Sequence, residues 1–98
     1  MRRMPDFNKL SLCYEAKNIQ NLGDELCNNL KCGDIIAKIT GNQKHCYQVS
    51  YKGVGEGEGM CLTYCAAGLI ETVSYDFING HWVYNSTDIC DLSDHIQA

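Results

Sequence analysis

The sequence predicts an α+β fold, in which an N-terminal amphipathic helix packs on one face of a four- to five-stranded antiparallel meander. Apolar residues recur every three or four positions before Gly33 and every second position after it. The Asn79-Gly80 pair separates two alternating segments, as in a tight hairpin. The 98-residue chain is 45% hydrophobic and contains one proline, which is typical of a globular domain. We therefore expect a single domain over residues 1–98.

The helix is expected over residues 6–31. A stripe of apolar or small side chains supports it, comprising Leu12, Ala16, Ile19, Gly23, Leu26 and Leu30. This spacing would place the stripe along one face of a helix, which could then be buried against the sheet. Pro5 suits the first turn and Gly33 suits the end. Because glycine weakens a helix, two short helices separated between Asn18 and Gly23 are the alternative.

The antiparallel sheet is expected over residues 34–85. Its first strands are predicted at residues 34–40, 44–51 and 60–66. Gly41-Asn42 supplies the turn between the first two strands, and a flexible glycine-rich loop at residues 53–59 leads into the third. An acidic tail over residues 86–98 is expected to follow the sheet.

The last hairpin is the best-defined local prediction. Asn79-Gly80 favours a two-residue type I′ turn, in which both residues adopt positive φ. This turn pairs Ile78 with His81, Phe77 with Trp82, Asp76 with Val83, and Tyr75 with Tyr84. One face then carries Val73, Tyr75, Phe77, Trp82 and Tyr84. We expect the helix to cover this face; the alternative is that its aromatic side chains form an exposed recognition surface.

Positive and negative charges are divided between the two halves of the chain. All eight Lys and Arg residues lie at or before Lys52. After them, every permanently charged side chain is a carboxylate: Glu56, Glu58, Glu71, Asp76, Asp88, Asp91 and Asp94. With a net charge of −4 and no basic cluster, direct binding to nucleic acid is not expected. The second half instead predicts a negative surface that attracts a basic partner.

Motifs for cofactors or catalysis are weak. The glycine run at residues 53–59 precedes a strand rather than a helix, and its two glutamates would repel phosphate. Cys61 and Cys65 would lie ~13 Å apart in one strand, and no cysteine pair has zinc-ribbon spacing. Cys46 follows His45, but neighbouring strand residues face opposite sides, which disfavours an activated thiol. We therefore predict no cofactor, no metal ligand and no catalytic residue.

The cysteines and the apolar pattern favour a cytoplasmic protein. Seven cysteines cannot all pair internally, and most are expected to act as small buried apolar residues. The basic start of the chain is followed by polar residues instead of the apolar stretch of a secretory signal. No run approaches the ~20 apolar residues of a membrane-spanning helix, so no membrane association is expected.

The predicted function is a small, non-enzymatic interaction protein of the adaptor or inhibitor type. Its predicted partner-binding residues are Glu56, Glu58, Asp76, Asp88, Asp91 and Asp94. These carboxylates would engage a basic protein surface, such as the groove of a nucleic-acid-binding protein. In size and charge alone, the chain resembles accessory proteins of phages and mobile elements that inhibit host factors.

The alternative function is a small-ligand domain for a metabolite or nucleotide. It would use the glycine-rich loop and the aromatic face as a pocket. Such a domain could also act as a homodimer, since an exposed edge strand offers a route to pairing. An enzyme is the third alternative.

Overall fold

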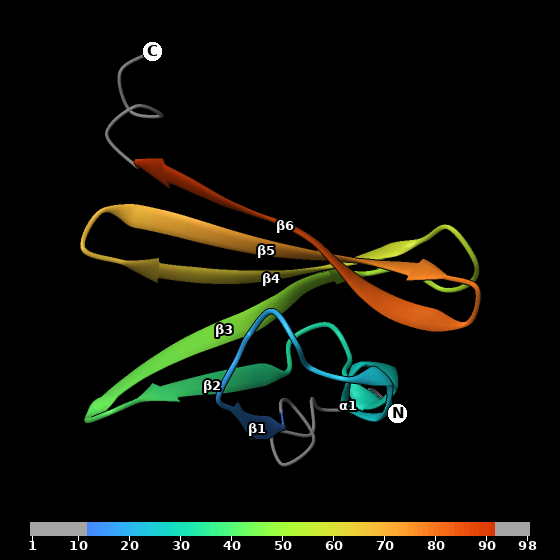
Figure 1. Cartoon of the computed structure of the whole chain (residues 1–98). Helices are drawn as coiled ribbons and strands as arrows, with labels where there is room; N and C mark the ends of the chain where they lie inside the picture. Colours follow the sequence, from blue (N-terminus) through green and yellow to red (C-terminus); the bar gives the residue numbers. More distant parts are fainter. Residues whose placement is uncertain (1–11, 92–98) are drawn as a thin grey trace, which may run out of the picture.

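The computed structural model describes residues 12–91 as a six-stranded mixed sheet with one short helix (Figure 1). In chain order the elements are β1 (Cys13–Ala16), α1 (Asp24–Asn29), β2 (Ile35–Thr40), β3 (Gln43–Lys52), β4 (Gly59–Ala66), β5 (Leu69–Ile78) and β6 (His81–Asp91). The strands lie side by side in the same order, with β1 parallel to β2 and all other neighbours antiparallel. The predicted α+β fold, with a long helix packed across a meander, is therefore wrong.

Most of the residues predicted as a helix are not helical. Residues 6–11 lie outside the described part of the chain, and within the rest of the prediction only Asp24–Asn29 is helical. The Asn18 side chain accepts a hydrogen bond from the Gln20 backbone N–H at 2.9 Å, which favours a turn. Gly23 then has a φ of 85°, outside the helical region. These two residues interrupt the helix that the apolar spacing predicts.

The pairing of β1 also overrides the helical pattern. β1 runs parallel to β2, with Cys13 opposite Ile35, and a parallel pair requires a crossover connection. The crossover contains α1 and brings Ile19 and Leu30 into the core, where both side chains are buried. Of the rest of the predicted stripe, Ala16 and Leu26 are partly buried against the core, whereas Leu12 is 58% exposed. The apolar spacing therefore identified part of the core but assigned it the wrong backbone conformation.

The Asp34 carboxylate fixes the end of this crossover. It is 4% exposed and accepts backbone N–H groups from Leu12 at 3.2 Å and from Lys31 at 2.9 Å. The two donors replace the water that a buried carboxylate loses.

The strands predicted at residues 34–40, 44–51 and 60–66 are confirmed, with small differences at their ends. Residues 41–42 and 79–80 form the predicted turns. In the second turn, Asn79 and Gly80 have φ values of 54° and 79°, as a type I′ turn requires. The cross-strand pairs predicted beside this turn all occur.

The predicted acidic tail over residues 86–98 is wrong in its first part, because β6 continues to Asp91. Opposite Ser74, β6 contains one extra residue, Asn85, which forms a β-bulge. The Asn85 side-chain amide donates to the Asp76 carboxylate at 2.8 Å. A bulge increases the local twist, and the second half of β6 runs away from α1 (Figure 1).

The core lies on one face of the sheet, which we call the inner face. Its buried side chains include Ile36, Tyr47, Val49, Met60, Leu62, Val73 and Tyr75. Tyr75 ties the crossover to this face, because its hydroxyl donates to the Ile19 carbonyl at 2.7 Å and accepts the Leu22 N–H at 3.1 Å. No strand or helix described in residues 12–91 packs against the opposite, outer face.

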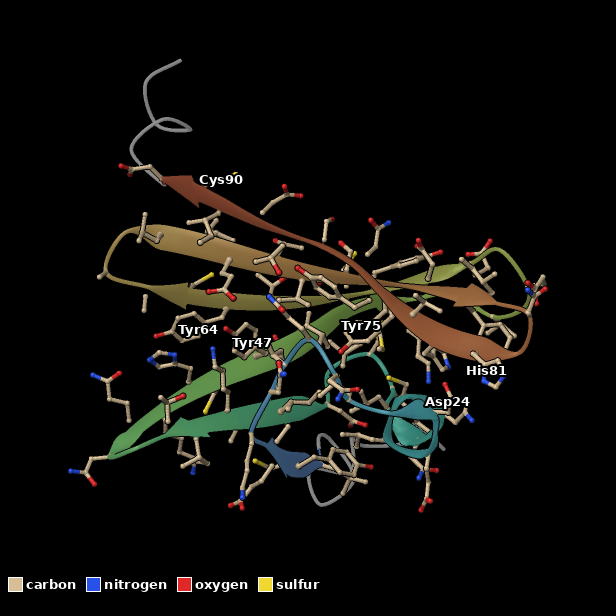
Figure 2. The ribbon with its side chains drawn as sticks, in the orientation of Figure 1. Asp24, Tyr47, Tyr64, Tyr75, His81 and Cys90 are labelled. Atoms are coloured by element: carbon tan, nitrogen blue, oxygen red, sulfur yellow. The ribbon has the colours of Figure 1, made fainter. Side chains whose placement is uncertain are left out.

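The two halves of the sheet diverge between β3 and β4 (Figure 1). These strands pair only through residues 48–52 and 60–63. Beyond them, aromatic rings bridge the gap: Tyr64 stacks on His45 with ring centres 4.8 Å apart and lies 5.2 Å from Tyr47 (Figure 2). The Tyr47 hydroxyl donates to Glu71 at 2.7 Å, and burial raises its pKa, so the phenol remains a donor.

α1 closes the sheet near the β5–β6 turn instead of covering its inner face (Figure 1). Its Asp24 carboxylate accepts the Trp82 backbone N–H at 2.8 Å, and its Asn28 side chain accepts the Trp82 indole N–H at 2.9 Å. At the other end, the Lys52 ammonium donates to backbone carbonyls at and beyond the last turn. Because a six-residue helix is unstable alone, these contacts with β3 and β6 hold it in place.

Candidate functional site

The structure places the predicted partner-binding carboxylates along the second half of the sheet. They lie in the loop before β4 (Glu56, Glu58), near the end of β5 (Asp76) and in β6 (Asp88, Asp91). Asp94 lies outside the described residues. The site is therefore built from one loop and the two last strands.

The glycine-rich loop is hydrogen-bonded to β5 and to the turn that follows it. The Gly57 N–H donates to the Phe77 carbonyl at 2.9 Å, and the Phe77 N–H donates to the Glu58 carbonyl at 2.8 Å. The Glu56 carboxylate accepts the Asn79 N–H at 2.6 Å. The loop was expected to be a flexible connection, but these bonds extend the sheet pattern and give both glutamates defined positions.

Glu58 is held on the outer-face side by Tyr51. The Tyr51 hydroxyl donates to the Glu58 carboxylate at 2.8 Å, and this bond raises the pKa of Tyr51. Tyr51 lies opposite Cys61, whose thiol is 3.9 Å from the Ser74 hydroxyl, so these side chains share the outer face. Gly53 leaves room for this arrangement, because a Cβ atom there would overlap the Glu58 carboxylate.

Asp76 and Asp88 also share the outer face. Asp88 pairs with Thr72, which precedes Asp76 by four residues in β5, so the two carboxylates lie ~13 Å apart along the strand. The Asp76 side chain accepts the Asn85 amide, whereas Asp88 is exposed. We call the resulting set the acidic surface: Glu56, Glu58, Asp76 and Asp88.

Asp91 is not part of the acidic surface. It pairs with Leu69, which lies on the same side of β5 as the buried Val73, so Asp91 belongs to the inner-face side at the far end of β6. Of the six residues that the sequence proposed, Glu58, Asp76 and Asp88 thus lie on the outer-face side of the sheet, and Glu56 is bonded to the β5–β6 turn. One of the other two faces away, and the last is not described.

No lysine neutralises the acidic surface in the described part of the chain. The nearest one in sequence, Lys52, donates instead at 2.5, 3.3 and 2.6 Å to the carbonyls of Cys27, Asn28 and Leu30. Burial lowers the pKa of Lys52. Within residues 12–91, the His81 ring contacts Asp24 at 2.7 Å and none of these four carboxylates. The acidic surface therefore presents its negative field to solvent.

The contact between α1 and β6 was hard to predict from the sequence. Asp24 contacts His81 Nδ1 at 2.7 Å and also accepts the Trp82 N–H (Figure 2). The His81 contact and the Trp82 bond together lower the pKa of Asp24. If residues 6–31 formed the predicted continuous helix, Asp24 would be a solvated surface group. The available signal was the sequence Gly-Asp-Glu, because acidic residues favour the first turn of a helix.

A pocket of about 370 Å³ lies beside this joint. It is lined by Asn28, Lys52, Gly53, Val54, Gly55, Phe77 and Trp82. The Trp82 ring centre lies 4.9 Å from that of Phe77 and 5.4 Å from the Lys52 ammonium. Because Lys52 already donates to backbone carbonyls, the pocket suits an apolar or aromatic group better than a phosphate.

The cysteines are more exposed than the sequence suggested. Burial raises the pKa of Cys27 to about 11, and this is the buried cysteine of the chain. The exposed ones are Cys13, Cys32, Cys46, Cys65 and Cys90. The expectation that most cysteines serve as small buried residues is therefore wrong. All seven are free thiols, and within residues 12–91 no three metal-binding side chains gather.

Two further findings concern membrane-spanning helices and similarity to known proteins. Within residues 12–91, no helix has the length and apolar character needed to cross a membrane. The sequence matches no protein-family model, and no match was found among the curated proteins or the solved structures.

Proposed function

We propose that the protein is a non-enzymatic binding domain, of the adaptor or inhibitor type, that docks onto a basic protein surface. The observation that supports this proposal is the acidic surface, whose four carboxylates have no cationic neighbour within residues 12–91. Asp91 and Asp94 stay predicted contributors to the same negative field. We place the protein in the cytoplasm, where seven free thiols would stay reduced.

Hydrogen bonds within the protein orient three carboxylates of the acidic surface, so that a basic partner could bind them. Within residues 12–91, Glu56, Glu58 and Asp76 each accept one hydrogen bond, through a single carboxylate oxygen. The other oxygen of each is available to a lysine or arginine of the partner. Because the protein already orients these side chains, less conformational entropy is lost on binding. The exposed Asp88 would add long-range attraction with less geometric specificity.

The natural partner of such a surface is a basic groove, such as that of a nucleic-acid-binding protein. There, the carboxylates would take positions that phosphates otherwise occupy. Electrostatic attraction of this kind speeds association and weakens as salt screens it.

A paired charge reversal tests this function. An immobilised linker histone serves as the cationic probe, and the test variant is the double substitution Asp76→Lys with Asp88→Lys. The matched control is Glu15→Lys with Glu25→Lys, two exposed carboxylates on β1 and α1. Both variants change the net charge equally. We expect the test variant to elute at lower salt than the wild type and the control to elute close to it.

Equal retention of the two double variants would contradict the proposal. Retention would then follow net charge alone, and the position of the carboxylates on the sheet would not matter. Urea unfolding of both variants checks that each retains the fold.

A small-ligand domain is the second candidate, and the pocket beside α1 supports it. The pocket joins the glycine-rich loop to the Phe77 and Trp82 rings, as that function requires. Trp82 is the single tryptophan of the chain, so its fluorescence reports directly on the pocket. A saturable change in emission with one member of a nucleotide and metabolite panel, lost in Phe77→Ala, would support it. No change across the panel would count against it.

A further inference from the structure

β6 is the last strand of the sheet, and its two halves differ in how their outer edge is covered. In the first half, α1 covers the edge, because Asp24 accepts the Trp82 N–H at 2.8 Å. In the second half, at residues 86–90 beyond the bulge at Asn85, no described strand pairs with the edge. Figure 2 shows the two ends of β6 far apart, with His81 beside α1 and Cys90 at the opposite end.

The hydrogen bonds of β5 show which groups of β6 point outward. Phe77 bonds through both its N–H and its C=O to the loop at residues 57–58, on the side away from β6. Residues of an antiparallel strand alternate in this respect, so Val73 and Glu71 also bond away from β6. Their partners in β6 are Thr87 and Ile89. The backbone N–H and C=O groups of Thr87 and Ile89 therefore point outward, toward the uncovered edge.

Such an edge can accept an extended chain as an additional strand. Two backbone residues, each with one donor and one acceptor, face outward at alternate positions, which matches the repeat of an incoming strand. The Ile89 side chain is 63% exposed and would gain an apolar neighbour. The edge therefore offers both backbone pairing and one apolar contact.

Charge decides which chain fits this edge. Asp88 lies between Thr87 and Ile89 and faces the outer side together with Asp76 on the adjacent strand. No lysine or arginine occurs in the sequence beyond Lys52. A second copy of this chain would bring another acidic edge against the first, which like charges disfavour. An extended segment with alternating basic side chains would instead place its charges beside Asp88.

We propose that residues 87–90 of β6 bind an extended, lysine- or arginine-bearing segment of the partner by strand addition. The inference rests on the proposed function, and it names the form of the partner element that the acidic surface attracts. Backbone bonds to Thr87 and Ile89 set the register, and Asp88, which lies between them, selects for positive charge.

The test uses the full chain and a short synthetic peptide in which lysine alternates with valine or threonine. A control peptide of equal charge replaces the valine and threonine residues with proline, which cannot donate to a ladder. The readout is amide hydrogen exchange resolved by residue. We expect the alternating peptide to slow exchange at Thr87 and Ile89, with little change at Asp88 and Cys90, whose amides already face β5. The proline peptide should leave all four amides unchanged.

A pair of variants at one position completes the test. Ile89→Pro removes one outward N–H and should weaken the alternating peptide by about tenfold. An edge strand tolerates proline where its N–H faces solvent, so the fold should persist. Ile89→Thr keeps the N–H and should bind within about twofold of the wild type, since it loses only part of one apolar contact.

Each result has one meaning. Salt-sensitive binding that leaves the Thr87 and Ile89 amides in fast exchange would overturn strand addition and leave the acidic surface as the docking site. Failure of both peptides and of the histone probe to bind would overturn the proposed function together with this inference.

Discussion

At the scale of single residues, a few polar side chains hold the crossover between β1 and β2. Tyr75 bonds to Ile19 and Leu22, and Asp34 bonds to Leu12 and Lys31. Each replaces the regular hydrogen bonds that a long helix would have supplied. Ile19 and Leu22 lie 56 and 53 residues from Tyr75 in the sequence, so periodicity alone could not identify these two contacts.

Tyr75→Phe tests the strongest of these contacts. The change keeps the ring but removes a hydroxyl that donates to Ile19 and accepts from Leu22. Because both backbone groups are then left without their partner, we expect the free energy of unfolding to fall by about 1–3 kcal/mol. Urea unfolding measures the change. Tyr51→Phe is the control, since its hydroxyl is exposed and its loss should cost less than about 1 kcal/mol.

If Tyr75→Phe and Tyr51→Phe lowered the free energy of unfolding by the same small amount, the stability of the crossover would not depend on the buried hydroxyl. Burial raises the pKa of Tyr75 to about 12, so its phenol is protonated throughout the neutral range. The measurement therefore needs no correction for ionisation near neutral pH.

Asp24 makes the stability dependent on pH in the acid range. Its pKa in the folded protein lies below the ordinary value of 3.8, mainly because of the bond to His81. The unfolded chain therefore takes up the proton first as the pH falls. The stabilising contribution of Asp24 is therefore complete above the ordinary pKa of 3.8, and it is lost as the pH falls through the lower pKa of the folded protein.

Asp24→Asn isolates this contribution. The variant should be less stable than the wild type near neutral pH, and the difference between their urea midpoints should shrink below about pH 4. A difference that stays constant down to about pH 2 would show that Asp24 does not link stability to protonation.

At the scale of elements, the hairpins could be predicted and the helix could not. The Asn79-Gly80 turn fixes its own register through positive φ at both residues, so local chemistry is sufficient. The N-terminal region carries an apolar spacing that fits a helix, but β1 pairs with β2 across about twenty intervening residues. A parallel pairing of this length leaves no local signature.

Lys52→Met tests what holds α1 in place. The ammonium donates to three carbonyls at and beyond the helix end, and no other described side chain replaces it there. We expect the free energy of unfolding to fall by about 1–3 kcal/mol, the usual range for hydrogen bonds to a charged group. The Trp82 emission should also shift, because the ammonium lies 5.4 Å from its ring centre.

Lys44→Met is the matched control for this change. Lys44 is an exposed lysine of the same strand, so its substitution should alter the unfolding energy by less than about 0.5 kcal/mol. A loss at Lys52 no larger than the loss at Lys44 would mean that the contacts with β6 hold α1 without Lys52.

At the scale of the whole molecule, Lys52 and the carboxylates that follow it in the sequence lie in different places in the structure. Lys52, the cation closest in sequence to the acidic half, donates to backbone carbonyls at the end of α1. The carboxylates on the outer face of β5 and β6 therefore stay without a lysine partner within residues 12–91. The sequence predicted the sign of this surface from composition. The sequence could not predict which carboxylates lie on the outer face. The register between β5 and β6 decides this, and it places Asp91 on the inner-face side.

The unexpected length of β6 has the same origin. Two aspartates, a serine and a threonine among residues 86–91 suggested a tail, but the segment pairs with the first half of β5. Strand pairing supplies backbone hydrogen bonds that composition does not reveal. This extension places Asp88 on the outer face and creates the uncovered edge.

The salt dependence of binding tests the central claim most directly. The dissociation constant for the linker histone is measured by titration over a series of salt concentrations, for the wild type and for both double variants. We predict a shallower dependence for Asp76→Lys with Asp88→Lys, and a dependence like that of the wild type for Glu15→Lys with Glu25→Lys. The same slope for both double variants would contradict a docking role for the outer face of β5 and β6.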